Sequence, residues 1–194
     1  MPNSRLRAFT QADAYTSPWT VRHRLGYLLW IVVSRMFFHP TPKLFYPWRV
    51  FLLKCFGAKV TGTPFVAASA IVRYPWLLTL EDRACLADKS ECYNLARITI
   101  KARATVAQQA YLCAGTHDFS DPRLPLVVGE IVVGEDVFIG ARAFVMPGVE
   151  IGAGAILGAC AVATKDLEAW MIYAGNPAKA VRKREMKVGP AVAS

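Results

Sequence analysis

The sequence lacks the patterns that mark several common protein classes. No run of consecutive apolar residues reaches the roughly 18 that a membrane-spanning helix requires, although 54% of the 194 residues are hydrophobic. The five cysteines form no CxxC pair and no cysteine–histidine metal spacing. No serine nucleophile elbow and no phosphate-binding P-loop is present. A chain of this length has room for one domain with a full core, and its chemistry must come from other motifs.

Acidic side chains are also scarce. The chain has 14 Asp and Glu against 23 Lys and Arg, a net charge of +9. This surplus either serves solubility alone or attracts a phosphate-bearing partner or an anionic membrane surface. Duplex nucleic acid is not expected, because the basic residues are scattered and no nucleic-acid motif accompanies them. An odd number of cysteines without a cleavable signal peptide predicts a reducing cytoplasm.

What the sequence does contain is a period of six residues. Residues 133–168 divide into VGEDVF, IGARAF, VMPGVE, IGAGAI, LGACAV and ATKDLE. Each block begins with an aliphatic or small apolar residue, namely Val133, Ile139, Val145, Ile151, Leu157 and Ala163. The fifth place is also apolar, with Val137, Ala143, Val149, Ala155, Ala161 and Leu167. A period of six fits neither an amphipathic helix nor a coiled coil.

This period predicts a solenoid in which a short strand and a tight turn take six residues. Three such units would close a coil of eighteen residues that buries its apolar residues against the next coil. Glycine follows the first residue in four blocks and is expected to allow a positive φ in the turn; these glycines are Gly134, Gly140, Gly152 and Gly158.

The same rhythm is present earlier, in a degenerate form. Apolar heads can be placed at Val60, Val66 and Val72, then at Leu80, Leu86 and Cys92, then at Ile100, Val106 and Leu112. Five coils are then expected, starting at Val60, Leu80, Ile100, Val133 and Ile151. The 21 residues from Leu112 to Val133 are too many for one block. They predict an inserted loop at about 118–132, and such insertions often form the binding face.

The ends of the chain differ from the repeat. Residues 1–57 are expected to form an N-terminal arm, with a loosely held start at 1–17, an apolar helical stretch from Leu25 to Phe38, a break at prolines, and a short helix ended by Gly57. These helices would cap the open end of the solenoid or contact another subunit. The alternative is an interfacial membrane anchor, because tryptophans lie beside basic residues.

The solenoid is predicted over 58–176, where a strand before the GNP turn continues the stack. Residues 177–194 form a basic C-terminal segment, expected to be a closing turn or short helix with a frayed end.

Of three histidines, one is placed for catalysis. His23 and His39 are expected to be solvated or to cap helices. His117 follows a buried-looking strand and lies where the repeat opens into the inserted loop. A neutral imidazole with an ordinary pKa of about 6.5 can accept a proton at physiological pH. The alternative is a structural histidine held by hydrogen bonds.

The hexapeptide blocks, the motif YLCAGTHDFSDP at 111–122 and the closing GACAVATKDL…AGNPAKAVRKR resemble the left-handed β-helix acyltransferases. Within them the chain is similar to the maltose and galactoside O-acetyltransferase branch, and most similar to the colanic acid (exopolysaccharide) biosynthesis acetyltransferases. The resemblance covers about residues 20–185. It implies an all-β, left-handed parallel β-helix, an exception to the right-handed preference of parallel crossovers.

The resemblance also implies the site residues. The catalytic histidine of these enzymes corresponds to His117. Their CoA contacts correspond to Ala141, Ala159, Thr164, Lys165, Lys179 and Arg182. Phe138 stands where these enzymes usually have tryptophan, and it keeps an apolar wall without the indole donor. The acceptor residues match less well, and the nearest candidates are Asn94 and Asp88.

These implications predict an acetyl-CoA-dependent O-acetyltransferase, a homotrimer without a metal that acts on a saccharide, nucleotide-sugar or lipid-linked sugar. It would be cytoplasmic, with peripheral contact to the inner face of the cell membrane through residues 18–57. The alternative is a non-catalytic scaffold that docks to a membrane-bound polysaccharide assembly complex. A zinc enzyme on the same fold would need three histidine ligands, and the solenoid holds only His117.

Overall fold

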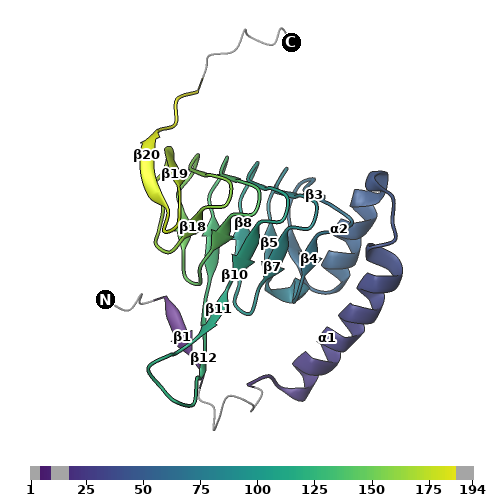
Figure 1. Ribbon diagram of the computed structural model, residues 1–194. Helices are drawn as coiled ribbons and strands as arrows, with labels where there is room; N and C mark the ends of the chain where they lie inside the picture. The colour runs from purple at the N-terminus through teal and green to yellow at the C-terminus, as the bar shows by residue number, and fades with distance from the viewer. Residues whose placement is uncertain (1–4, 10–17, 187–194) are drawn as a thin grey trace, which may run out of the picture.

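The computed structural model describes residues 5–9 and 18–186. The chain winds into a three-sided solenoid of short parallel strands, with two helices packed at its N-terminal end (Figure 1). One side holds β2 (Lys59–Val60), β5 (Leu78–Leu80), β8 (Ile98–Ile100), β13 (Ile131–Val133) and β16 (Glu150–Ile151). The second holds β3 (Phe65–Val66), β6 (Cys85–Leu86), β9 (Thr105–Val106), β14 (Phe138–Ile139), β17 (Ile156–Leu157), β19 (Met171–Ala174) and β20 (Lys179–Lys183). The third holds β4 (Ile71–Val72), β7 (Glu91–Tyr93), β10 (Tyr111–Cys113), β15 (Phe144–Val145) and β18 (Val162–Ala163).

The strand register confirms the five predicted coils. On the first side, Val60, Leu80, Ile100, Val133 and Ile151 are directly paired in succession. The predicted heads on the other two sides pair in the same way. The insertion between Leu112 and Val133 leaves this register intact, since Leu112 pairs with Val145 in the next coil.

The core lies inside the coils, where the sequence pattern predicts it. Every head from Val66 to Ala163 is buried, and Val60 in the first coil is partly exposed. The apolar residues at the fifth place of blocks 133–168 are buried as well. Burial of this continuous column of side chains provides the main favourable term in folding.

The glycines after the heads have a different purpose from the one predicted. Gly134, Gly140, Gly152 and Gly158 do not have positive φ. A Cβ on Gly140 would lie 2.5 Å from the Ala159 nitrogen in the next coil, and one on Gly152 would lie 2.5 Å from the Ala169 nitrogen. Close stacking of coils therefore requires glycine here. The left-handed φ occurs two residues later, where Asp136, Arg142 and Cys160 adopt it without being glycine.

Two helices cover the first coil. Helix α1 (Val21–Val33) continues as a π-helical turn, η1 (Ser34–Phe38). Pro40 and Pro42 separate it from η2 (Lys43–Phe45) and α2 (Tyr46–Cys55). Thr20 caps α1 by accepting a hydrogen bond from the His23 nitrogen. Gly57, with φ +89°, follows the end of α2 as predicted. A further 3₁₀ turn, η3 (Pro75–Leu77), precedes β5.

The inner faces of these helices confirm the cap interpretation. Trp30 is buried, and its Nε1 donates to the Val72 carbonyl 2.7 Å away. Arg49 on α2 is fully buried, and its guanidinium donates to the Val66 carbonyl of the first coil at 2.8 Å. The same group donates to Thr41 Oγ1 and to the Pro42 and Lys43 carbonyls. This side chain fastens α2 and the proline turn to the solenoid.

The segment predicted as an inserted loop is largely a β-hairpin. Strands β11 (Gly115–His117) and β12 (Leu126–Gly129) pair antiparallel, so the loop itself is confined to residues 118–125. Within the arm predicted to be loosely held, β1 (Leu6–Ala8) pairs antiparallel with β12. The rest of residues 1–17, apart from 5–9, lies outside the described residues. The three strands form a small separate sheet that projects from one corner of the solenoid (Figure 1).

In the described part of the C-terminal segment, up to residue 186, the chain forms a turn followed by a strand, and the alternative of a short helix is not found there. β19 continues the stack on β17, as predicted, and a turn at residues 175–178 leads into β20, which pairs antiparallel with β19. Arg184 then donates to the carbonyls of Asp136 and Gly154, which anchors this segment across two coils.

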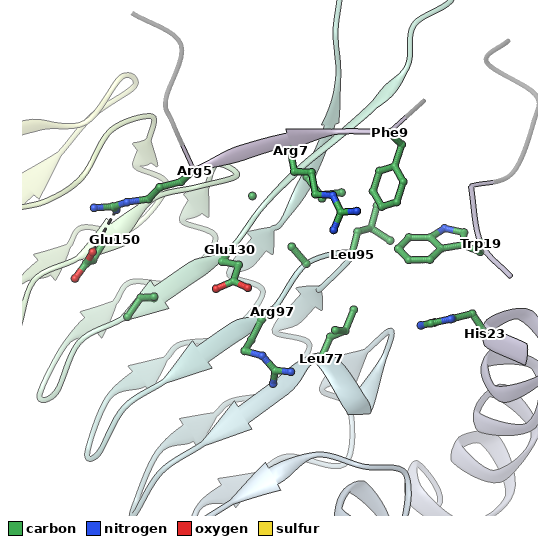
Figure 2. Close-up of a pocket in the computed structure, with 14 residues that line it drawn as sticks. Arg5, Arg7, Phe9, Trp19, His23, Leu77, Leu95, Arg97, Glu130 and Glu150 are labelled. Carbon is green, nitrogen blue, oxygen red and sulfur yellow. Dashed lines mark ion pairs between the residues drawn. The ribbon is translucent and has the colours of Figure 1, made fainter. Parts of the chain in front are cut away.

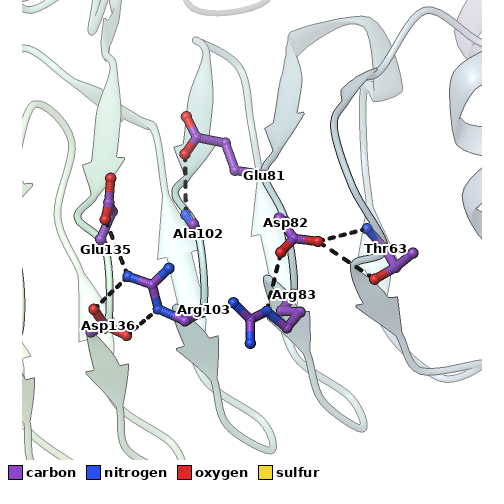
Figure 3. A network of polar contacts seen from close by, with 8 residues as sticks. All are labelled: Thr63, Glu81, Asp82, Arg83, Ala102, Arg103, Glu135 and Asp136. Atoms are coloured by element: carbon purple, nitrogen blue, oxygen red, sulfur yellow. Dashed lines mark hydrogen bonds and ion pairs between the residues drawn. The ribbon is translucent and has the colours of Figure 1, made fainter.

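Polar side chains connect successive coils at one corner. Figure 3 shows that the Arg103 guanidinium donates hydrogen bonds to Asp136 and Glu135 of the next coil. In an earlier coil, Asp82 accepts a hydrogen bond from the Thr63 nitrogen. The hydrogen bonds from Arg103 lower the pKa of the Asp136 carboxyl. These contacts are largely exposed, and such pairs contribute little to stability. Across the part of the chain that the structure describes, no helix is long and apolar enough to span a bilayer.

Candidate active site

His117 is the last residue of β11 and has an exposed side chain. Its Nδ1 lies 2.7 Å from the carbonyl oxygen of Leu124, on the other side of the hairpin loop. A carbonyl oxygen only accepts hydrogen bonds, so Nδ1 carries the proton. Nε2 is therefore the nitrogen with the free lone pair, and the hydrogen bond fixes the direction in which it points. The backbone of the hairpin loop thus fixes the orientation of the imidazole.

The loop that orients His117 is shaped by its own aspartates. The Asp118 carboxylate accepts hydrogen bonds from the backbone nitrogen and hydroxyl of Ser120, at 2.9 and 2.6 Å, which lower its pKa. Asp121 is paired in the same way with Arg123, which lowers the pKa of Asp121 to about 2. Both carboxylates remain ionised and hold turns. The Leu124 carbonyl is thereby brought under the imidazole.

Cys113 does not act with His117 as a nucleophile. Its thiol donates to the Gly115 carbonyl at 3.0 Å, and burial raises its pKa. A protonated, partly buried thiol is a weak nucleophile.

The hairpin sheet connects His117 with the N-terminal arm. His117 is directly opposite Leu126 in the register, and the Phe9 nitrogen donates to the Leu126 carbonyl at 2.8 Å. Arg7 is opposite Val128, two residues from Leu126 on the same strand. Cross-strand partners, and residues two apart, share one face of a sheet. His117 and Arg7 therefore lie on the same face of this small sheet.

A cavity of about 650 Å³ opens beside that face. Figure 2 shows Arg7 reaching into it from β1, with Phe9 and Trp19 toward one end and the Arg5–Glu150 ion pair at the other. Its lining combines aromatic and aliphatic surface with planar polar groups. The lining includes Arg7, Phe9, Trp19, Leu95, Arg97 and Glu130. Hydroxyl groups can be bound by guanidinium and carboxylate groups, and apolar faces by the aromatic rings.

Sequence reasoning missed this cavity. The strand that carries Arg7 has only three residues and shows no usable alternation. The pairing of β1 with β12 joins positions more than 100 residues apart, and nothing in the local pattern predicts it.

The predicted CoA contacts occupy the corners of the last coils. Ala141 and Ala159 lie in successive turns after β14 and β17, and the Cys160 nitrogen donates to the Ala141 carbonyl at 2.9 Å. No described residue accepts a hydrogen bond from the N–H of Ala141 or Ala159. The same holds for Glu135 and Ala153 in neighbouring turns, so these free donors are a general feature of the coil corners.

The other predicted contacts are exposed in the C-terminal part. Thr164 and Lys165 follow β18, and Lys179 and Arg182 lie on β20. Phe138 on β14 is 43% exposed and borders a smaller cavity of about 280 Å³ that Arg184 also lines. It therefore offers the apolar surface that the sequence predicts.

Neither predicted acceptor residue is placed to bind a ligand beside His117. Asn94 is fully buried, and its amide exchanges two hydrogen bonds with the backbone of Tyr74, at 3.0 and 2.6 Å. It joins two coils and presents no surface to a ligand. Asp88 is exposed and accepts from Ser69 at 2.9 Å, but it lies at the corner of Ala141 and not at that of His117.

His117 and the alanines are on different corners of one chain. His117 projects after β10, whereas Ala141 and Ala159 follow β14 and β17 on the preceding side of the solenoid. A full side of the coil separates the two corners. A single chain therefore does not bring the predicted base and the predicted thioester contacts together. No group of three or more His, Cys, Asp or Glu in residues 5–9 and 18–186 is arranged to hold a metal ion.

A solenoid of six-residue units, with an exposed histidine where the repeat is interrupted, defines a class of transferases. The family model for the bacterial transferase hexapeptide (six repeats) matches residues 130–165. WcaF of Escherichia coli K12, a candidate colanic acid biosynthesis acetyltransferase, is 39% identical over 156 residues, which cover 80% of this chain and 86% of WcaF. The chain belongs to the hexapeptide-repeat acetyltransferases.

Solved structures share the fold. A maltose O-acetyltransferase from Clostridium difficile 630 matches with a TM-score of 0.74 at 20% identity, covering 86% of this chain and 90% of that one. A hexapeptide-repeat acetyltransferase from Vibrio cholerae, VCA0836, in complex with acetyl coenzyme A, matches with a TM-score of 0.79 at 15% identity, covering 89% and 94%. At these identities the likeness concerns the fold.

Proposed function

We propose that this chain transfers the acetyl group of acetyl-CoA to a hydroxyl of a saccharide, an exopolysaccharide precursor, with His117 as general base. The observation that carries the proposal is the hydrogen bond from Nδ1 to the Leu124 carbonyl, which leaves Nε2 free at an exposed position. The relatives support the chemistry: WcaF is described as an acetyltransferase of colanic acid biosynthesis, and VCA0836 binds acetyl-CoA.

In the proposed reaction, Nε2 takes the hydroxyl proton while the sugar oxygen attacks the thioester carbonyl. The tetrahedral intermediate collapses by breaking the C–S bond, and the CoA thiolate takes the proton from the imidazolium. A general base of this kind contributes about 10²–10⁴-fold in rate. A free backbone N–H such as that of Ala141 would stabilise the oxyanion.

We further propose that the active enzyme is a homotrimer. The His117 corner and the Ala141 corner are separated within one chain, so a thioester in contact with both needs the first corner from one subunit and the second from its neighbour. Thr164 and Lys165 would then border the same cleft. The exposed cations Lys179 and Arg182 would bind the phosphates of CoA.

The cavity beside the hairpin sheet is the proposed acceptor site. Arg7, Arg97 and Glu130 would bind sugar hydroxyls there, and Trp19 would pack on the apolar face of the ring. We also propose that the protein works in the cytoplasm, in peripheral contact with the inner face of the cell membrane. A lipid-linked precursor would be accessible to it there.

Acetyl-CoA is expected to raise the melting temperature of the purified chain. At 100 times the dissociation constant, a ligand stabilises the folded state by about 2.7 kcal/mol, which corresponds to roughly 5–10 °C in a chain of this size. Differential scanning fluorimetry measures the shift. An Arg182→Ala variant should need more acetyl-CoA for the same shift, whereas Lys59→Ala, at the other end of the solenoid, should not. The scaffold alternative requires no shift at all.

An Arg7→Ala variant is expected to bind the acceptor more weakly. Loss of a hydrogen bond from a charged group raises KM for the acceptor by roughly 10–100-fold, with little change in the KM for acetyl-CoA. The assay uses the sugar, nucleotide sugar or glycolipid that gives the fastest release of CoA from acetyl-CoA. Arg83→Ala, on a distant corner, is the matched control. Equal acceptor KM values for the two variants would place the acceptor elsewhere.

A further inference from the structure

Helix α1 is apolar on both of its faces. The inner face, with Trp30, covers the first coil. The outer face carries a stripe of exposed apolar side chains at helical spacing, which continues onto η1. Its members, each more than half exposed, are Val21, Leu25, Leu28, Leu29 and Val32 on α1 and Met36 on η1. Packing on the first coil explains why the inner face of α1 is apolar, but it does not explain the apolar outer face. An outer stripe of this length is unusual on a protein surface unless something covers it.

The outer stripe continues onto the second helix. Trp48 Nε1 donates to the Phe37 carbonyl at 2.9 Å, which joins the end of η1 to α2. The ring of Trp48 stacks on Phe51 with centroids 5.5 Å apart. The exposed apolar residues of α1 and of the segments after it are called here the outer helical face. Beyond the α1 stripe it includes Phe37 on η1, Leu44 and Phe45 on η2, and Trp48 and Phe51 on α2.

The charges around this face have one sign. No Asp or Glu occurs between Asp13 and Glu81. Exposed basic residues border the apolar stripe, namely Arg22, Arg24, Arg35, Lys43 and Lys54. Two copies of the face packed against each other would bring these cations together without any acidic partner. An anionic surface matches them instead.

We propose that the outer helical face binds anionic phospholipid. The helices would lie in the plane of the membrane surface, with Leu28 and Trp48 in the outer acyl region and the arginines at the lipid phosphates. The tryptophan favours the interfacial level. This inference does not depend on the acetyl transfer proposed above, because none of these residues belongs to the site of His117.

The test is sedimentation of the full-length protein with lipid vesicles. We expect binding to an equimolar phosphatidylcholine–phosphatidylglycerol mixture, and binding at least tenfold weaker to phosphatidylcholine alone, because each basic residue near an anionic surface contributes about fivefold. Added salt should release the protein from the mixed vesicles. Failure to bind either vesicle overturns the proposal, and equal binding to both overturns its headgroup part.

Matched variants locate the contact. Leu28→Glu places a charge on the outer helical face without disturbing the core and should reduce binding at least tenfold. Val181→Glu makes the same change at an exposed position of β20 and should leave binding unchanged. Equal loss in both variants contradicts the assignment. A fall in the mass of the lipid-free assembly in Leu28→Glu alone, measured by light scattering, would mean that a second copy covers the face.

Discussion

An alanine at position 117 is expected to lower kcat for acetyl transfer by about 10²–10⁴-fold, the contribution of a general base. The KM for acetyl-CoA should change little, because the role proposed for the imidazole of His117 is to take a proton from the acceptor hydroxyl. The rate of CoA release in the presence of an accepted sugar measures the effect. The imidazole is exposed, and among residues 5–9 and 18–186 its one hydrogen-bond partner is the Leu124 carbonyl, so its loss should not unfold the chain.

His39 offers a matched control for this variant. Its Nδ1 also lies 2.7 Å from a carbonyl, that of Ala68, but it is part of the helical cap. His39→Ala should therefore keep near-normal activity. A His117→Ala enzyme that assembles as wild type and retains activity would remove His117 from the mechanism. Loss of activity in both variants alike would indicate a general structural effect.

An alanine at position 49 is expected to destabilise the folded chain by about 2–5 kcal/mol, the range seen when a large buried side chain is truncated to alanine. Arg49 is fully buried and donates to four oxygens. Its removal leaves a cavity and unsatisfied carbonyls between α2 and the first coil. Chemical denaturation with a fluorescence readout measures the loss, and thermal melting should show a drop of roughly 10 °C.

Arg35→Ala is the control for the cap. Arg35 is an exposed arginine in the same arm, and surface substitutions of this kind usually change stability by less than about 0.5 kcal/mol. If Arg49→Ala is as stable as Arg35→Ala, the guanidinium does not fasten the helices to the solenoid. Acetyl-CoA binding by the folded fraction of Arg49→Ala should be preserved, because α2 packs on the first coil and the proposed CoA contacts Ala141 and Ala159 lie in the last two coils.

The solenoid itself could be predicted because its signal is redundant. A single apolar residue such as Val133 predicts no particular fold, but an apolar residue recurs at the head of every block. Where a block departs from the pattern, as at Cys92, the spacing of its neighbours still identifies its head. The pairing of Val72 with Cys92 and of Leu112 with Val145 follows the predicted heads without a shift. His117 could be singled out as a candidate for the same reason, since it lies where the six-residue repeat is interrupted.

The site around His117 could not be predicted, because its parts are not periodic. β1 joins β12 across more than 100 residues, and a three-residue strand has no recognisable pattern of its own. The glycines were located correctly and explained wrongly, since sequence does not reveal how closely the backbones of adjacent coils approach. The left-handed winding stays a prediction, because strand order and register are the same for either hand. The trimer also stays a prediction.

The undisturbed register across the hairpin has a consequence for how such enzymes diversify. Ile100 pairs with Val133 and Leu112 with Val145 as if residues 114–130 were absent. Because the free energy of closing a flexible loop rises by only about 0.6 kcal/mol for each doubling of its length, this segment can be exchanged or lengthened without altering a core position. The stack of coils is thus a constant frame, and the hairpin at its edge is a segment that can change in length and sequence while the core stays the same.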